Sequence, residues 1–223
     1  MIKIIAISDT HNQLDKVELP EGDILVHGGD LTMGGSLEEF YKLNVHLGKI
    51  KRKYKHILLN AGNHDHLAQG NPKLAKSLIT NAKLLIDEEI TVEGLKFYFS
   101  PWSNWFHDWS FNFSESDLDN GEIEATKKYA EIPDDVNVLI THGPAFNLLD
   151  KVNNYSVKNK GRMHVGSTAL AKRINELKNL KLSVCAHIHE SYGRLESDGK
   201  TFVNAAILNE YYQVTNKPWV IEL

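Results

Sequence analysis

The chain has 223 residues, which is enough to bury a substantial core in one larger domain or in two small ones. Hydrophobic residues make up 42% of it and charged residues 24%, the balance of an ordinary globular protein in water. The formal net charge of −4 excludes the overall basic surface that binds nucleic acid or anionic membranes. We therefore expect neither nucleic acid nor a membrane as a partner.

The N-terminus and the single cysteine bear on location. Residues 1–11, MIKIIAISDTH, reach charged side chains too early for a secretory signal peptide, and no apolar run is long enough to span a bilayer. Cys185 is the only cysteine, so an intramolecular disulfide is impossible, and its apolar surroundings predict core packing rather than a nucleophile. These features predict a reducing, cytoplasmic location.

Short apolar runs rich in β-branched residues predict strands along the whole chain. They cover residues 2–7, 23–27, 56–59, 95–99, 136–140, 180–186, 201–203 and 219–223. Helix-like segments lie between several of them, at residues 36–53, 71–79, 121–130 and 166–178. The first is the clearest, because Ser36 and Glu39 form a capping-box pattern before apolar residues at helical spacing.

The order of these elements predicts the fold class. Strands that alternate with helices indicate an α/β layered fold with largely buried sheets. The chain has no internal repeat, low-complexity tract or linker, which favours one domain over residues 1–223.

Residues 100–120 form a long segment without a predicted helix or strand. The segment is rich in Ser, Asn, Asp and aromatic residues, and loops of this length in a compact domain tend to be functional. It holds Trp102, Trp105 and Trp109. Either at least one of these rings lines a substrate pocket, for which Trp102 and Trp105 are the candidates, or the rings anchor the loop on the core.

Polar side chains with metal-binding chemistry lie just past the carboxyl ends of several predicted strands. In open α/β sheets this edge is where ligands bind. Residues two apart in an extended segment project to the same side, so Asp9 with His11, and His187 with His189, can each converge on one point. The full set is Asp9, His11, Asp30, Asn63, His64, His142, His187 and His189.

The donor set narrows the choice of metal. Carboxylates and imidazoles without a thiolate suit Mn²⁺, Fe or Zn²⁺ better than the all-oxygen cages of Ca²⁺ or Mg²⁺. The donors are too many for one tetrahedral ion, whereas two ions that share a bridging carboxylate would use all of them. Two ions roughly 3.5–4 Å apart activate a hydroxide and clamp both oxygens of a phosphoryl transfer. We therefore expect two divalent or trivalent transition-metal ions, with manganese as the first choice.

Five short motifs, in this order, resemble those of the calcineurin-like metallophosphoesterases. They are Asp9-Thr10-His11, Gly29-Asp30, Gly62-Asn63-His64-Asp65, His142-Gly143 and His187-Ile188-His189. The resemblance implies a sandwich of two mixed β-sheets flanked by α-helices. It also implies one metal ion held by Asp9, His11, Asp30 and His189, and a second held by Asp30, Asn63, His142 and His187. His64 is then the catalytic imidazole that faces the phosphate; the alternative for His64 is a hydrogen-bonding role.

Longer segments are similar to the small metallophosphoesterase-domain proteins related to the brain-expressed phosphodiesterases of vertebrates. Among them are SPWSNWFHDWSFN from residue 100 and AHIHESYG from residue 186. This similarity implies a small phosphodiester substrate, such as a cyclic nucleotide, attacked by a hydroxide that bridges the two ions. The chain lacks the second Asp and the Arg of the GDxxDRG motif of protein serine/threonine phosphatases, which argues against a phosphoprotein substrate.

Three alternative functions stay open at this point. A nuclease of the same superfamily would need a surface for a nucleic-acid strand, and the acidic balance counts against it. A phosphomonoesterase would use the same metal site. A non-catalytic scaffold on this fold would be expected to lack some ligands or the catalytic histidine, and all of them are present.

Overall fold

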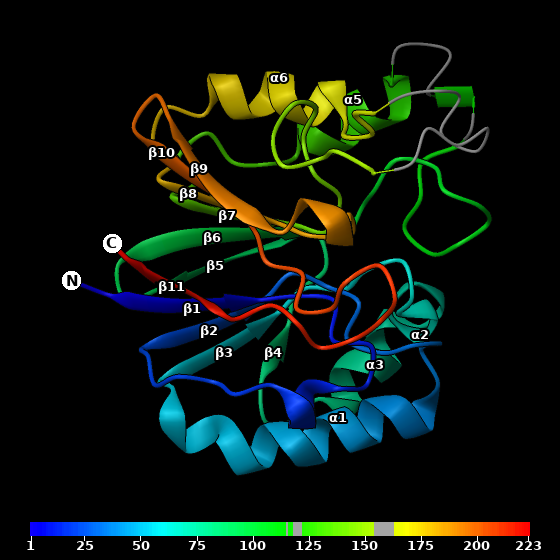
Figure 1. Cartoon of the computed structure of the whole chain (residues 1–223), viewed down its shortest axis with the longest axis vertical. Coiled ribbons are helices and arrows are strands. Elements are labelled where there is room, and N and C mark those ends of the chain that lie inside the picture. The colour runs from blue at the N-terminus through cyan, green and yellow to red at the C-terminus, as the bar shows by residue number, and fades with distance from the viewer. Residues whose placement is uncertain (115, 118–121, 154–162) are drawn as a thin grey trace.

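The computed structural model describes residues 1–114, 116–117, 122–153 and 163–223. Two β-sheets pack face to face, and helices cover the outer face of each sheet (Figure 1). The fold class expected from the sequence, two mixed sheets in a sandwich flanked by helices, is confirmed. In the described part of the chain, no helix is both long and apolar enough to cross a membrane.

The first sheet has five strands in the order β11-β1-β2-β3-β4. They are β1 (Lys3–Ile7), β2 (Ile24–His27), β3 (His56–Leu59), β4 (Lys83–Leu84) and β11 (Trp219–Glu222). Strands β1 to β4 are parallel, and β11 pairs antiparallel with β1, with Ile4 opposite Ile221. Both faces of β1 and β2 are covered, which explains why these strands are continuous apolar runs in the sequence.

The second sheet has six strands in the order β5-β6-β7-β8-β10-β9. They are β5 (Glu88–Val92), β6 (Leu95–Ser100), β7 (Val138–Thr141), β8 (Leu182–Cys185), β9 (Gly193–Ser197) and β10 (Lys200–Asn204). The four central strands are parallel, whereas the edge strands β5 and β9 pair antiparallel with their neighbours. Strands β4, β5 and β9 are not predicted from the sequence.

The helices lie on the outer faces of the two sheets. On the first sheet are α1 (Leu37–Ile50), α2 (His66–Gly70) and α3 (Pro72–Leu78); on the second are α5 (Ile123–Tyr129) and α6 (Thr168–Glu176). The predicted capping box is present: Ser36 Oγ accepts from the backbone N–H of Glu39, whose carboxylate accepts from the backbone N–H of Ser36. Helix α1 ends at Ile50, and the last predicted residues, Lys51–Lys53, form a 3₁₀ turn. Helix α2 is not predicted from the sequence.

Three hydrophobic clusters hold these layers together. One lies between the sheets and includes Ile4 and Val26 from the first sheet and Val138 and Val184 from the second, all fully buried. The other two lie between each sheet and its own helices. Because both faces of each sheet are covered by apolar side chains, the polar residues of the central strands are left at the strand ends.

Those strand ends meet at one edge of the sandwich. The loop after β1 bonds to the loop after β2 through the backbone N–H of Asp9 and the carbonyl oxygen of Gly29, 3.0 Å apart. The loop after β7 bonds to the loop after β8 through Ala186 N–H and the carbonyl oxygen of His142, also 3.0 Å apart. The edge therefore collects groups from four loops that lie far apart in the sequence.

Candidate metal centre

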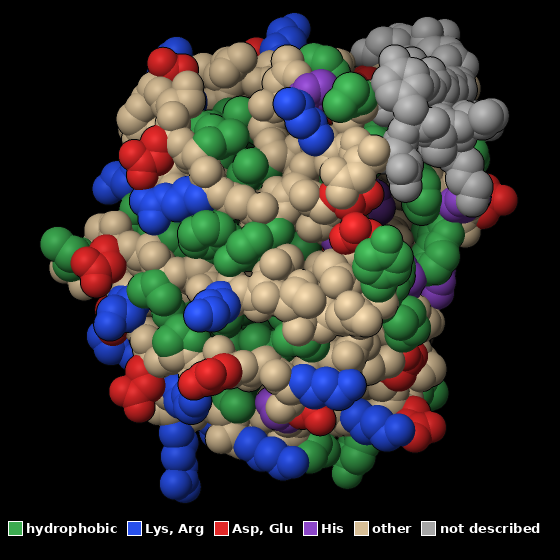
Figure 2. Space-filling view, viewed as in Figure 1, with side chains coloured by type: hydrophobic (Ala, Val, Ile, Leu, Met, Phe, Trp, Pro, Cys, Tyr) green, Lys and Arg blue, Asp and Glu red, His purple; other side chains and the backbone are tan. Residues whose placement is uncertain are grey.

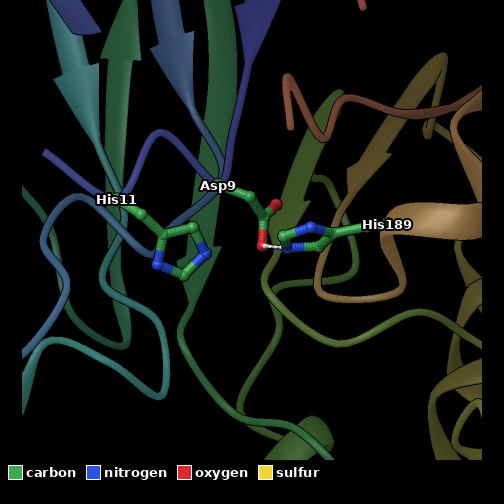
Figure 3. A group of neighbouring side chains, drawn as sticks. All are labelled: Asp9, His11 and His189. Atoms are coloured by element: carbon green, nitrogen blue, oxygen red, sulfur yellow. Dashed lines mark hydrogen bonds and ion pairs between the residues drawn. The ribbon is translucent and has the colours of Figure 1, made fainter. Parts of the chain in front are cut away.

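One group of metal-binding side chains gathers around the carboxylate of Asp9. His189 Nε2 lies 3.2 Å from Asp9 Oδ1, and the His11 ring lies on the other side of the same carboxylate (Figure 3). His189 donates its Nδ1–H to the carbonyl oxygen of Asn209 at 2.9 Å, so its Nε2 is the atom left to face Asp9. Potential ligand atoms of Asp9, His11 and His189 all lie within 4.8 Å of one another.

A second carboxylate, Asp30, lies between two sets of donors. Its Oδ2 atom is 3.6 Å from His11 Nε2 and 3.5 Å from His142 Nε2. Its Oδ1 atom accepts the backbone N–H of His64 at 2.8 Å, which fixes the orientation of the carboxylate. His142 Nε2 also lies 2.8 Å from Asn63 Oδ1. Asp30 thus lies between His11 and His142, and its expected role as the bridging ligand stays a prediction.

His187 enters the cluster by a different contact. Its backbone N–H points at both oxygens of the Asp9 carboxylate, each at 3.3 Å, and its ring centroid lies 5.1 Å from that of His142. The structure therefore brings all the predicted ligands into one site at the carboxyl edge. Their division between two individual ions stays a prediction.

His64 lies at the same site and is held in place through its Nδ1 nitrogen. Its Nδ1 donates to the carbonyl oxygen of Met33 at 2.8 Å, and its Nε2 lies 4.0 Å from Asp30 Oδ2. The ring packs edge-on against His11, with centroids 4.5 Å apart. A ligand atom of His64 lies within 4.8 Å of those of His11 and Asp30, so distance alone also permits a metal-ligand role.

The backbone of the site is strained at the residues that carry the donors. Asp9, His11, Asp30 and His187 have φ of 50°, 39°, 52° and 66°, in the left-handed region that residues with a Cβ rarely adopt. A conformation of this kind costs on the order of 1–3 kcal/mol per residue, so surrounding contacts must impose it. Gly62 is part of that framework, because a Cβ there would lie 2.3 Å from Asp30 Oδ1.

Asp65 ties two of the ligand-bearing loops together. Its Oδ2 accepts from the backbone N–H of Leu31 at 3.1 Å and of Gly62 at 2.9 Å, and its Oδ1 accepts from the backbone N–H and the hydroxyl of Thr32. Burial and the charge of nearby Asp30 raise the pKa of Asp65 to about 7. Asp65 belongs to the third motif of the sequence, but no role was predicted for it. Its place directly after Asn63 and His64 was the feature that could have indicated a supporting role.

Each of the two buried carboxylates of the site lies next to a histidine that carries the opposite charge. Although burial acts to raise them, the pKa values of Asp9 and Asp30 are held well below the usual range by His189 and by His142 respectively. Burial acts to lower the pKa of both histidines, but Asp9 raises that of His189 to about 9 and Asp30 raises that of His142 to about 9. Without cations the site therefore holds two buried carboxylate–imidazolium pairs.

The same site has the features that a cation requires. Both ring nitrogens of buried His11 have no hydrogen-bond partner among the described residues. Burial lowers the pKa of His11 to about 4, so its ring is neutral and can donate a lone pair. Donor atoms about 3.5 Å apart can share an ion to which each binds at about 2.0–2.2 Å. The residues present fit a carboxylate- and imidazole-bound transition metal.

The two candidate tryptophans of the long loop have different surroundings. Trp102 stacks on Phe113 with centroids 5.3 Å apart, meets Phe111 edge-on, and donates its Nε1–H to Asp87 at 2.9 Å. These contacts favour the alternative in which Trp102 anchors the loop on the core. The half-buried ring of Trp105 lies 6.2 Å from that of His107, centroid to centroid, and substrate contact by Trp105 stays a prediction.

Other aromatic rings lie closer to the cluster. Trp109, from the same loop, packs on His64 with centroids 4.0 Å apart, and its other neighbour is His66. Tyr212, from the segment after β10, lies 4.9 Å from His11 and 5.5 Å from His189. In Figure 2, histidine and hydrophobic side chains come to the surface together at the right-hand edge, where the strand-end loops of Figure 1 lie. Tyr212 was missed by the sequence analysis, because it follows no motif and no predicted strand directly.

Comparison with known proteins gives three findings. A family model described as calcineurin-like phosphoesterase matches residues 2–191. Metallophosphoesterase domain-containing protein 1 of Homo sapiens is 34% identical over 244 residues, covering 99% of this chain and 71% of that protein, and a UPF0046 protein of Caenorhabditis elegans is 32% identical over 234 residues, covering 98% and 74%. A solved crystal structure with 16% identity superposes with a TM-score of 0.56 over 91% of this chain and 89% of that one, a likeness of fold alone.

These similarities reach beyond the motifs, because the relatives match nearly the whole chain and the family model includes every strand from β1 to β8. The family expected from the ordered motifs and the two-sheet fold agree with them. The chain belongs to the calcineurin-like phosphoesterase family, and within it is related to the metallophosphoesterase domain-containing proteins.

Proposed function

We propose that the protein is a dinuclear metal-dependent hydrolase of small phosphodiesters. One observation carries the proposal: a single oxygen of Asp30 lies 3.6 Å from His11 Nε2 and 3.5 Å from His142 Nε2, between two sets of donors. A carboxylate in that position can serve two cations at once. The family membership supports the reaction class, hydrolysis of a phosphoric ester.

The residues divide into two ligand sets that share Asp30. We assign Asp9, His11, Asp30 and His189 to one cation, and Asp30, Asn63, His142 and His187 to the other. When bound, a pair of cations lowers the pKa of a water molecule and neutralises charge on the phosphoryl oxygens. The strained, buried loops hold the donors in place before substrate arrives, so little reorganisation is needed during the reaction.

His64 is the proposed proton donor to the leaving oxygen. Its Nδ1–H is committed to Met33, so Nε2 is the nitrogen available on the side of Asp30 and the substrate. Trp109 packs on the imidazole and reduces its contact with water. A positioned acid of this kind contributes typically 10²–10⁴-fold to a rate.

The charges around the site support a diester over a monoester. Within the described ranges, the charged neighbours of Asp9 and Asp30 are histidines and each other, and neither carboxylate forms an ion pair with a Lys or Arg side chain. A monoester dianion carries more charge to be neutralised than a diester monoanion, and its sites commonly use Arg or Lys clamps. A cyclic nucleotide, the substrate implied by the subfamily resemblance, is a small diester of this type.

The test uses purified protein stripped of metal and reloaded with Mn²⁺, Fe or Zn²⁺ in turn. Hydrolysis of bis-p-nitrophenyl phosphate and of p-nitrophenyl phosphate is compared, together with 2′,3′- and 3′,5′-cyclic AMP. We expect metal-dependent turnover with a higher kcat/KM for the diesters. A higher value for the monoester would overturn the diester assignment, and no turnover with any metal would overturn the enzymatic function.

A further inference from the structure

Tyr212 is a bulky, partly exposed residue at the edge of the candidate metal centre. Its φ is 59°, in the left-handed region, where a residue with a large side chain is uncommon. The residue is 40% exposed, so part of its ring stays open to solvent. With this backbone conformation the ring lies beside His11 and His189 of the candidate metal centre.

Hydrogen bonds hold the short segment around Tyr212 in place. Asn209 Oδ1 accepts from the backbone N–H of Tyr211 and of Gln213, both at 3.0 Å, and the backbone N–H of Tyr212 donates to the Asn209 carbonyl at 2.9 Å. The backbone N–H of Asn209 donates to the carbonyl of Gln213 at 3.0 Å, and the Gln13 side chain donates to the carbonyl of Tyr212 at 3.1 Å. The segment is therefore a fixed support and not a loose loop.

The ring that this support presents faces the site. Its centroid lies 4.9 Å from His11, 5.5 Å from His189 and 6.4 Å from His64, with interplanar angles of 60° to 66°. These three imidazoles meet Tyr212 at steep angles, so none of them stacks flat on its ring. A group bound with its phosphorus at the cations can extend along the exposed part of this ring.

We infer that Tyr212 is a substrate-contacting, specificity-determining residue, whose ring stacks on a planar aromatic group of the ester, such as a nucleobase or an aryl group. The inference rests on the proposed function, because the phosphoryl group must lie at the metal centre for its organic group to reach Tyr212. Stacking of one base on an aromatic side chain changes affinity by roughly 5- to 150-fold. The contact is made by the ring and does not require the phenolic hydroxyl.

The test measures binding rather than turnover. Calorimetry on metal-loaded protein compares adenosine 5′-phosphate with ribose 5-phosphate, which differ only in the base. We expect wild type to prefer the nucleotide by roughly 5- to 150-fold. Tyr212→Leu should lose most of that preference and Tyr212→Phe should keep it. Tyr211→Leu is the matched control, because Tyr211 is the adjacent ring in the same segment, is 74% exposed, and should keep the preference.

Several outcomes would overturn the inference. They are the absence of a base preference in wild type, an equal loss of affinity for both ligands in Tyr212→Leu, and an effect of Tyr212→Phe as large as that of Tyr212→Leu. Loss of bound metal from Tyr212→Leu, measured by elemental analysis, would also overturn it, because the ring would then support His11 or His189 instead. If wild type hydrolyses phosphodiesters but binds both ligands with equal affinity, this inference alone is wrong. If wild type hydrolyses no phosphoric ester with any metal, the proposed function is wrong.

Discussion

The loops that carry the candidate metal ligands lie at the same edge of the sandwich as two exposed aromatic rings, those of Phe106 and Tyr212. The two groups of residues differ in burial. Asp9, Asp30 and His142 are at most 2% exposed and are fixed by backbone bonds between loops. Phe106 and Tyr212, whose rings lie beside His187 and His11, are 42% and 40% exposed. The buried loops can hold cations at fixed positions, while the exposed rings leave room for a bound group. We infer that reaction chemistry and substrate choice belong to separate parts of this edge.

The largest expected effect comes from the shared carboxylate. Asp30→Asn removes the negative charge that lies between His11 and His142, so both cation positions should weaken together. Elemental analysis after gel filtration should show a marked loss of metal, and hydrolysis should fall to background. Asp135→Asn is the control, because Asp135 is exposed and pairs with Lys96 away from the site. Two retained ions with near-normal turnover would show that Asp30 is not the bridge.

His64 tests whether a buried residue of the site acts on substrate without holding metal. His64→Ala should keep its metal content and lose about 10²–10⁴-fold in kcat. The loss should be smaller for an ester of p-nitrophenol, whose leaving group needs no proton, than for an alkyl ester. His46→Ala, a half-buried histidine on α1, should behave as wild type. Loss of metal from His64→Ala would assign His64 to the ligands instead.

The buried pairs predict that metal binding releases protons. His142 and His189 have pKa values raised to about 9 in the metal-free protein, so both rings are protonated at pH 7 and must lose a proton before they bind a cation. Raising the pH towards 9 removes these protons, so apparent metal affinity should rise by about tenfold per pH unit for each proton released. Calorimetry at pH 7 in buffers of different ionisation enthalpy measures the number released. Binding without proton release would contradict the paired state of these residues.

The smallest effect on activity is expected from Trp102. Trp102→Ala removes the contacts with Phe113 and Asp87 and should lower the free energy of unfolding by about 3 kcal/mol. Its KM for a cyclic nucleotide should change little, because the ring packs on the core. Denaturant unfolding and steady-state kinetics on the same sample separate the two effects. A rise in KM confined to nucleotides, with an unchanged free energy of unfolding, would show that Trp102 contacts the substrate and does not anchor the loop.

The strands that were predicted from the sequence differ in position from those that were not. Every predicted strand is present. Seven of them are central strands, which are continuous apolar runs because both of their faces are covered, and the eighth, β11, is an edge strand with three apolar residues out of four. Strands β5 and β9 were missed because they are the two edges of the second sheet, where burial is partial and polar residues are tolerated. Strand β4 has only two residues, too few for a pattern to indicate. Helix α2, five residues directly after Asp65, was equally too short for its periodicity to be detected.

The fold class and the kinds of side chain at the candidate metal centre follow from local patterns in the sequence. Its ligands lie in short motifs directly after strands, and the parallel arrangement of those strands brings the motifs to one edge. Which aromatic rings lie beside these side chains is visible in the tertiary structure and not in the sequence. Trp102 packs towards the core and Trp109 packs on His64. Tyr212 reaches His11 through a turn that is held by Asn209 and by Gln13, a residue 199 positions away in the chain. Local patterns encode strand ends, whereas the neighbours of an exposed ring depend on packing between segments distant in sequence.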